Sequence, residues 1–262
     1  MSTSEPGQPP ITSADGGPAP GSWSRELPVP TSALAVGAHP DDVEFGAGGT
    51  LAKWAAAGCE IHHLVCTDGS KGTWDVSADL DSLIRRREEE QREAARRLAG
   101  GRAGTVHFLG VTDGELEVGL ALRSEIARII RSVRPSVVLG HDPWRRYRLH
   151  PDHRAAGFLL LDAVVAARDP HFFPEHGLEA HRPGALLLWE ADVANHVEDV
   201  TTSLAAKLAA LHAHESQFES TMKVAGHEEL AAFDERVSRR LRTLGEPHGY
   251  AAAEVFHLID DL

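Results

Sequence analysis

The first group of residues that could do chemistry is His39-Pro40-Asp41-Asp42, which directly follows a short apolar run at residues 34–38. Such a run, bounded by turn-forming residues, predicts a buried strand, so the group lies on a loop where an α/β sheet places its ligands. One imidazole and two carboxylates are ligands that suit zinc. Because neighbours in one turn cannot easily aim at the same point, we expect one aspartate to bind a metal and the other to face the open coordination position.

A second group, His150-Pro151-Asp152-His153, follows another apolar run at residues 136–140 after a loop. Proline is favourable just inside a helix start, where its missing N–H is not needed. The two histidines are three positions apart and can share one helix face. Either group alone could be a helix cap or a set of surface or packing residues, since the chain has 16 histidines. Two such groups, each behind a strand, favour convergence on one ion.

Strand and helix patterns alternate along most of the chain. The alternation predicts βαβ units and a mainly parallel sheet, which carries its sites at the carboxyl ends of the strands. Because we find no internal repeat and no linker after residue 30, we predict one α/β domain at residues 31–262. The strands are expected at residues 34–38, 61–66, 105–109, 136–140, 185–189 and 255–259, and the helices at residues 46–57, 80–99, 120–133, 151–167, 201–218 and 227–244.

Composition narrows the function classes. The formal net charge of −13 repels phosphate backbones and anionic lipids, so we expect neither a nucleic-acid nor a membrane partner. No apolar run is long enough to span a bilayer. Residues 1–30 contain seven prolines and four glycines and predict a disordered tail, not a secretory signal, which favours the cytoplasm. Cys59 and Cys66 are expected to be buried hydrophobes and not a redox pair.

Several segments together resemble the LmbE-like, or PIG-L, family of zinc-dependent N-acetylglucosaminyl deacetylases. The resemblance covers residues 33–257, and the ordered pair of HPDD and HPDH is its most specific feature. It implies a Rossmann-like three-layer fold, in agreement with the alternation of strands and helices. The segments are AHPDDVEFGAGGTLAKWAAAG, TDGSKG, RREEEQREAARRLAG, LGVTDGEL, LHPDHRAAG, AALHAHESQ and the closing AAAEVFHL.

The resemblance assigns roles to individual residues. It implies that His39, Asp42 and His153 bind the metal. It also implies that Asp41 is the general base and that His150 stabilises or protonates the reacting centre.

On the substrate side, Arg87 and Asp113 match family residues near the active site. Some members place a mobile tyrosine two residues before the first histidine of HPDH. Arg148 occupies that position here, with Tyr147 beside it, and we expect both at the substrate. Val43 departs from the glutamate that many members have after the paired aspartates, but this position is not a metal ligand.

Other polar residues have a functional and a structural interpretation. His141-Asp142-Pro143 ends a predicted strand. In the functional interpretation, the loop that follows borders the substrate and Asp142 orients a ligand histidine. In the structural interpretation, Asp142 only forms an Asp-Pro turn. The three arginines of the following loop hint at an anionic or polar substrate group. His62, His63 and His214 are expected to be packing residues.

The expected reaction is hydrolysis of an amide. Three protein ligands leave a fourth position for water, as in catalytic zinc sites. Asp41 would take the proton of the attacking water, and His150 would help at the oxyanion; either could protonate the leaving amine. The predicted substrate is a small N-acetylglucosamine-type sugar or its conjugate. Zn²⁺ is the expected metal, and Fe²⁺ would also suit these ligands.

Three alternatives remain open at this point. The enzyme could be an amidase of a thiol-sugar conjugate, or a deacetylase of a glycosylated natural product. From a different class, the chain could be a metal-binding scaffold without turnover. Asp41 and His150 argue against the scaffold, because neither is needed merely to hold zinc. A homo-oligomer is compatible with the sequence.

Overall fold

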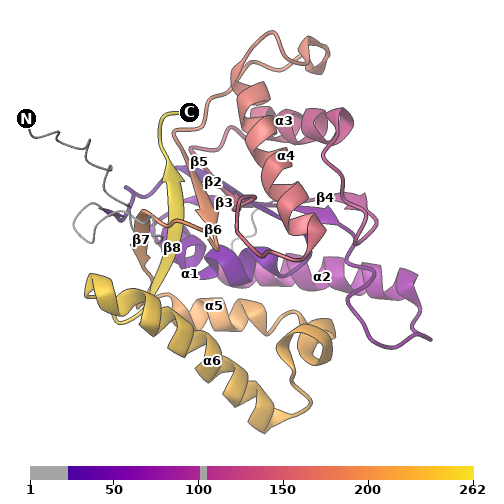
Figure 1. The fold of residues 1–262 in the computed structure, drawn as a ribbon, viewed down its shortest axis with the longest axis vertical. Coiled ribbons are helices and arrows are strands. Elements are labelled where there is room, and N and C mark those ends of the chain that lie inside the picture. The colour runs from indigo at the N-terminus through magenta and orange to yellow at the C-terminus, as the bar shows by residue number, and fades with distance from the viewer. Residues whose placement is uncertain (1–22, 101–104) are drawn as a thin grey trace, which may run out of the picture.

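The apolar run that predicts the first strand lies in the interior of an eight-stranded sheet in the computed structural model, which describes residues 23–100 and 105–262. Helices cover both faces of this sheet, so the chain forms three layers (Figure 1). The strands in chain order are β1 (Ser24–Arg25), β2 (Ser32–Gly37), β3 (Glu60–Thr67), β4 (Val106–Val111), β5 (Val137–His141), β6 (Ala185–Trp189), β7 (His196–Asp199) and β8 (Ala253–Ile259).

The order of the strands reverses next to β2. Across the sheet the order is β1-β7-β8-β6-β5-β2-β3-β4. β8 runs antiparallel to β6 and β7, and the other neighbouring strands are parallel. The chain runs outward from β2 through β3 to β4, and then returns to the other side of β2 as β5. This arrangement confirms the predicted Rossmann-like α/β fold with a mainly parallel sheet.

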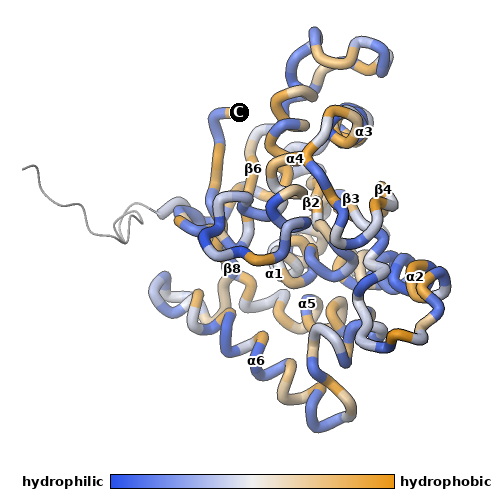
Figure 2. Tube along the Cα trace, turned by 45° about the vertical axis from the view of Figure 1, so that its right-hand side comes forward, coloured by the Kyte–Doolittle hydropathy of each residue, from blue (hydrophilic) through white to orange (hydrophobic). Residues whose placement is uncertain are grey.

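Two groups of helices enclose the sheet. One face is covered by α1 (Asp42–Ala56), α2 (Leu80–Leu98) and α5 (Leu204–Leu211), and the other by α3 (Leu120–Val133) and α4 (Pro151–Arg168) (Figure 1). A further helix, α6 (His227–Gly245), lies outside α5 and also contacts β8. In Figure 2 the path of α6 alternates between hydrophilic and hydrophobic segments, as an amphipathic helix does.

The central strand β2 is buried on both faces, because its side chains alternate between the two helical layers. Leu34 and Val36 pack in the core that includes α3 and α4 residues. Ala33 and Ala35 pack in the opposite core, which includes Trp54 of α1. A strand that is apolar on both faces can present polar groups only beyond its end, where His39 follows.

The predicted disordered tail extends too far into the domain. Ser24–Arg25 form β1, which pairs in parallel with β7. The Leu27 N–H donates to the buried Glu198 carboxylate at 2.8 Å, and Pro30 is buried. Backbone pairing with β7 therefore orders a segment whose composition predicts disorder, and the predicted boundary at residue 30 is too late. Residues 1–22 lie outside the described residues.

Two elements in the last third of the chain differ from their predictions. α5 ends at Leu211 and is followed by two short helical segments, Glu215–Gln217 and Phe218–Met222, where one helix was expected at residues 201–218. β7 is absent from the predicted strands because its sequence, His-Val-Glu-Asp, has a single apolar residue. Its histidine and glutamate are nevertheless buried, and their side chains pair at 3.0 Å.

Two expectations from composition can be compared with the structure. Cys59 and Cys66 are buried free thiols, as expected. Within the described ranges, each helix is too short or too polar to cross a bilayer.

Candidate active site

Both predicted motifs lie at the crevice between β2 and β5, where the strand order reverses. His39 follows β2 after Ala38, and His141 is the last residue of the neighbouring β5. His150 is the N-cap of α4, and His153 lies in the first turn of that helix. Open α/β sheets bind ligands at such a switch point, outside the carboxyl ends of the strands.

His39, Asp42 and His153 bring two ring nitrogens and the two oxygens of one carboxylate together. His39 Nδ1 lies 3.1 Å from His153 Nε2 and 3.3 Å from Asp42 Oδ2. His153 Nε2 lies 3.4 Å from Asp42 Oδ1. A tetrahedral ion with bonds of about 2.0–2.1 Å separates its ligand atoms by about 3.4 Å. Each of these separations is close to that value, with Asp42 facing His39 through Oδ2 and His153 through Oδ1, so the three side chains could surround one zinc ion.

Other combinations of neighbouring side chains also offer donor atoms within 4.8 Å of one another. These combinations share residues. Among the described residues they therefore form one metal-binding cluster with more than one possible set of ligands. The sets are His39, His150 and His153; His39, Asp113, His150 and Asp152; and Asp42, His141 and His153.

The second nitrogen of His39 faces two carboxylates. Its Nε2 lies 3.2 Å from Asp113 Oδ1 and 3.2 Å from Asp152 Oδ2. Burial disfavours the protonated imidazole, but the hydrogen bonds with Asp113, Asp152 and Asp42 outweigh it and raise the pKa of His39 to about 12. With a metal bound at Nδ1, the Nε2–H would still donate to a carboxylate, an arrangement that orients ligand histidines in metal sites.

His150 and His153 stack against each other at the start of α4. Their ring centroids are 4.9 Å apart with planes at 18°, and the His150 ring also meets the edge of His39 at 4.5 Å. Burial lowers the pKa of His153 to about 3, and burial also lowers the pKa of His150. Both rings are therefore neutral near pH 7, and each has one nitrogen with a free lone pair. Arg148 contacts the Glu190 carboxylate and also His153 Nδ1. Because a guanidinium can only donate, His153 Nε2 can bind a metal once Arg148 releases Nδ1.

His141 contacts the Asp42 carboxylate and positions it. The Trp189 indole N–H donates to His141 Nδ1 at 3.0 Å, and His141 Nε2 lies 3.2 Å from Asp42 Oδ2. Burial lowers the pKa of His141, so the ring is neutral. Because an indole nitrogen can only donate, Nδ1 accepts and the proton of the neutral ring lies on Nε2, directed at Asp42. The Ala38 N–H, which approaches Nε2 at the longer distance of 3.4 Å, is then not bonded to it. The His141 ring also stacks on His153 at 4.4 Å.

Asp142 does not take the role of orienting a ligand histidine. Its Oδ1 accepts the Trp144 N–H at 2.9 Å, and its Oδ2 accepts the Asp192 N–H at 2.7 Å. It therefore shapes the loop after β5, as an Asp-Pro turn does, and its neighbour His141 contacts the cluster instead.

Asp41 is held in a backbone conformation that residues other than glycine rarely adopt, with φ 106° and ψ −24°. Its N–H donates to Gln91 Oε1 at 3.0 Å. Arg87 donates to Pro40 O at 2.6 Å and to Gly69 O at 2.7 Å, and it lies 3.8 Å from Asp41 Oδ2. Two side chains of α2 thus fix the loop and hold the Asp41 carboxylate at the cavity.

A buried polar layer lies behind Gln91. The Gln91 amide donates to Glu44 Oε1 at 2.8 Å, and the other Glu44 oxygen lies 3.3 Å from His214 Nε2. Burial alone would raise the pKa of Glu44, but His214 and His63 lower it overall. A carboxylate at this place requires the Gln91 amide nitrogen to face it, which directs the amide oxygen at the Asp41 N–H. His214 and His63 are buried, as expected, but they contact Glu44 in this polar layer and do not pack in the apolar core.

The environment of Asp41 predicts how kcat/KM falls at acidic pH. Burial raises the pKa of Asp41 to about 6, although Arg87 lowers it. A nearby metal cation would lower it further. As a base, Asp41 acts only when ionised, so kcat/KM should fall tenfold per pH unit below a midpoint at or below about pH 6. Replacing Arg87 with glutamine should move this midpoint to higher pH. An unchanged midpoint in that variant would show that another group titrates.

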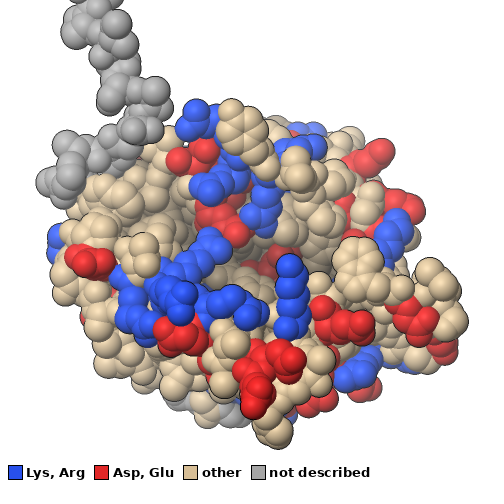
Figure 3. Space-filling view, turned by 60° about the horizontal axis from the view of Figure 1, so that its bottom comes forward, with Lys and Arg blue, Asp and Glu red and all other residues tan. Residues whose placement is uncertain are grey.

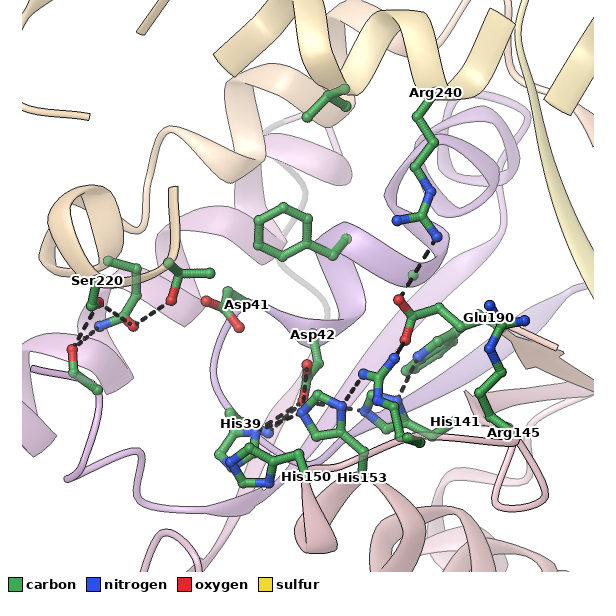
Figure 4. Close-up of a pocket in the computed structure, with 18 of the residues that line it drawn as sticks. His39, Asp41, Asp42, His141, Arg145, His150, His153, Glu190, Ser220 and Arg240 are labelled. Carbon is green, nitrogen blue, oxygen red and sulfur yellow. Dashed lines mark hydrogen bonds and ion pairs between the residues drawn. The ribbon is translucent and has the colours of Figure 1, made fainter. Parts of the chain in front are cut away.

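The cluster opens into a cavity of about 880 Å³. Arg87, Asp113 and Arg148 line it. The five predicted metal and catalytic residues also line it and are labelled in Figure 4. The structure thus brings together eight of the nine predicted site residues. Tyr147 is the exception: its side chain is 94% exposed and is not part of the cavity wall. Tyr147 has a positive φ of 61°, which turns the loop at this point.

Three residues at the cluster had no predicted role. His141 stands at the end of a predicted strand, and Asp152 stands inside the HPDH motif, so both positions carried a usable signal. Asp152 is fully buried, contacts His39 and accepts the Gly114 N–H at 2.7 Å. Gln91 lies within a helix of charged residues, where its sequence gives no sign that it turns inward.

Comparisons with known proteins find related sequences and structures. The family model PIG-L, described as GlcNAc-PI de-N-acetylase, matches residues 34–164. The chain is 38% identical to diacetylchitobiose deacetylase of Thermococcus kodakarensis over 188 residues, which cover 71% of this chain and 69% of that protein. It is 34% identical over 169 residues to 1D-myo-inositol 2-acetamido-2-deoxy-alpha-D-glucopyranoside deacetylase 2 of Saccharopolyspora erythraea, covering 55% of this chain and 60% of that protein.

A solved structure shows the same similarity in three dimensions. N,N'-diacetylchitobiose deacetylase from Pyrococcus horikoshii superposes with a TM-score of 0.79 and 29% sequence identity. The superposition covers 88% of this chain and 84% of that one.

Proposed function

The chain belongs to the PIG-L, or LmbE-like, family and is a deacetylase, and we propose that it removes the N-acetyl group of an N-acetylglucosamine-type sugar or its conjugate with the help of zinc. The observation that carries this proposal is the donor set of His39, Asp42 and His153, whose nitrogens and carboxylate oxygens lie 3.1–3.4 Å from one another. Beside it, the carboxylate of Asp41 lines the same cavity without belonging to that set.

The three donor residues would hold the metal and leave a coordination position toward the cavity. When bound, zinc supplies a Lewis acid and lowers the pKa of a bound water to about 7. Through the contacts described above, His141 orients Asp42, and Asp113 and Asp152 orient His39.

Asp41 is the residue that we assign as general base. Its carboxylate is buried beside the cluster, and Gln91 and Arg87 restrict the loop that carries it. This restriction fixes the direction in which the proton is taken, which is the geometric requirement for general base catalysis. After the proton has been taken, the neutral Asp41 carboxyl can return it to the amine that leaves.

His150 is assigned to the developing charge on the substrate carbonyl. Its Nδ1 accepts the Asp152 N–H at 3.3 Å, which leaves the Nε2 side of the ring for the cavity. In a neutral ring with this hydrogen bond, the proton lies on Nε2 and can be donated to an oxyanion.

The substrate class is supported by the relatives. Both similar proteins described above are named deacetylases of N-acetylated amino sugars, one of diacetylchitobiose and the other of an acetamido-glucopyranoside of inositol. Arg87, Asp113 and Arg148 line the cavity next to the cluster, so they are the proposed contacts for sugar hydroxyl groups.

An assay of amine release tests this proposal. We expect the zinc-loaded protein to release free amine and acetate from N-acetylglucosamine or its glycosides, and a chelator to abolish the release. Readdition of zinc should restore it, and the same treatment with magnesium should not. Absence of amine release from every member of a panel of N-acetylated amino sugars, in a preparation shown to contain stoichiometric zinc, would contradict the proposed reaction.

A further inference from the structure

A buried ion pair lies where the cavity meets helix α1. Figure 3 shows Lys, Arg, Asp and Glu side chains at the surface around a hollow, where water can solvate them. Lys207 of α5 and Glu254 of β8 are instead each 2% exposed, although both line the cavity. Lys207 Nζ lies 2.6 Å from Glu254 Oε1. Burying such a pair removes two charges from water and often adds no net stability, so its place in the interior points to another role.

Both charged groups are directed at the backbone of α1. Lys207 Nζ donates to Phe45 O at 2.7 Å. The Glu254 carboxylate accepts the N–H groups of Gly49 and Thr50, at 2.9 and 2.8 Å. Phe45 O and Gly49 N–H are the two ends of one i to i+4 step, which an α-helix ordinarily closes by itself. Here each end has a charged partner from outside the helix.

The glycines of α1 permit this close approach. A Cβ at Gly48 would lie 3.2 Å from Lys207 Cγ. A Cβ at Gly49 would lie 3.1 Å from Glu254 Oε1 and 2.8 Å from Val200 Cβ. Glycine weakens a helix interior relative to alanine. The sequence of α1 therefore has a cost in helix propensity, and what it permits is contact with the ion pair.

The backbone of Phe45 links this pair to the metal loop. Its N–H donates to Asp41 O at 3.1 Å, while its C=O accepts from Lys207. The first turn of α1, residues 42–45, is thus tied at both ends, and it carries Asp42. Asp41, just before it, has a positive φ of 106°, and such a strained conformation persists only where its surroundings fix it.

We infer that Lys207 and Glu254 are positioning residues, which hold the first turn of α1 so that Asp42 faces the metal and Asp41 faces the substrate. Lys207 fixes the carbonyl end of this turn, and Glu254 holds the following turn through its N–H groups. Both act through the backbone, and neither belongs to the sets of metal donors. The inference rests on the proposed function, because that proposal assigns Asp42 as a ligand and Asp41 as the base.

A double variant separates positioning from stability. Removing one partner would leave the other buried and unpaired, which strongly destabilises a protein, whereas replacing both by apolar residues is often neutral. We therefore combine Lys207→Met with Glu254→Met and confirm folding by thermal unfolding. A pair that only stabilised the fold would leave this folded variant fully active.

Positioning predicts a different result for the same variant. Its dissociation constant for zinc should rise about 10- to 100-fold, the cost typical of losing groups that orient metal ligands. Its kcat at saturating zinc should fall by a similar factor with little change in KM, because a small misplacement of the base acts on the chemical step.

Lys53 and Glu198 supply the matched control. They also form an ion pair between α1 and a strand, and Glu198 is buried, but the pair lies at the last turn of the helix and outside the cavity wall. Lys53→Met combined with Glu198→Met should keep the zinc affinity and the kcat of the wild type, whatever its effect on stability. An equal loss of zinc affinity in this control would overturn the inference, since the effect would then be one of general stability.

Zinc affinity is measured without turnover, so it tests the inference even if the proposed reaction fails. Wild-type zinc affinity and kcat in the folded double variant of Lys207 and Glu254 would overturn the inference and leave the proposed function standing. If that variant does not fold, Glu254→Gln takes its place, because it removes the charge and keeps the shape of the side chain. A loss of zinc affinity and kcat there would support positioning, and wild-type values would equally overturn it.

Discussion

Replacing Asp41 with asparagine is expected to keep the metal and to lose about 10²- to 10⁴-fold in kcat, the contribution typical of a positioned general base. At 1.36 kcal/mol for each factor of ten, this is about 2.7 to 5.4 kcal/mol of transition-state stabilisation. Asparagine is the sharper variant, because Asp41 has φ 106° and asparagine tolerates a positive φ better than alanine does. It also keeps the backbone N–H that donates to Gln91. The change therefore removes basicity and little else.

Three measurements make this result decisive. Elemental analysis should give the same zinc content for the variant and the wild type, and thermal unfolding should show that the variant is folded. Asp162→Asn is the matched control, because Asp162 is a partly exposed carboxylate on α4 whose ion-pair partner, Arg123, lies outside the cavity. Its turnover should be that of the wild type. If Asp41→Asn turned over substrate at near the wild-type rate with full zinc content, another residue would be the base.

The main parts of the fold and the site were predictable because they depend on local patterns. Apolar runs such as residues 34–38 predict buried strands wherever they occur, and alternation with helices implies parallel pairing. Once the strand order is parallel, polar residues behind two strands must lie at the same edge of the sheet. The convergence of the motifs at His39 and His153 follows from that geometry.

The site residues that were not predicted acquire their roles from partners far away in the sequence. His141 acquires its role from Trp189, which lies on the neighbouring strand β6 and fixes the imidazole tautomer. Gln91 turns inward because Glu44 and Asp41 offer it partners 47 and 50 residues away. In a helix dominated by charged residues, periodicity alone does not reveal such a contact.

The elements that were predicted wrongly also depend on partners distant in the sequence. β1 forms through pairing with β7, and β7 forms between β1 and β8. Neither strand has the apolar alternation that predicts a strand. Tyr147 was placed at the substrate by its position before the HPDH motif. The loop conformation turns its side chain outward, and Arg148 faces the cluster instead.

The metal ligands are tested by a pair of variants within one helical turn. His153→Ala is expected to lose the metal, and with it all measurable turnover. Changes in residues that merely support metal ligands already cost about 10- to 100-fold in affinity, so loss of a ligand should cost more. Alanine is a good helix former, so α4 should begin as before. Zinc content after dialysis, measured by elemental analysis, is the readout.

His150→Ala is the matched variant, and its outcome distinguishes the overlapping sets of donors. If His39, Asp42 and His153 hold the ion, His150→Ala should retain stoichiometric zinc while kcat falls, because His150 acts on the substrate. If the ion is held by His39, His150 and His153, both variants should lose the metal. Stoichiometric zinc retained in His153→Ala would contradict the assignment of this residue as a ligand. Metal content, and not activity, therefore separates the ligand residues from the catalytic ones, since both kinds of variant reduce turnover.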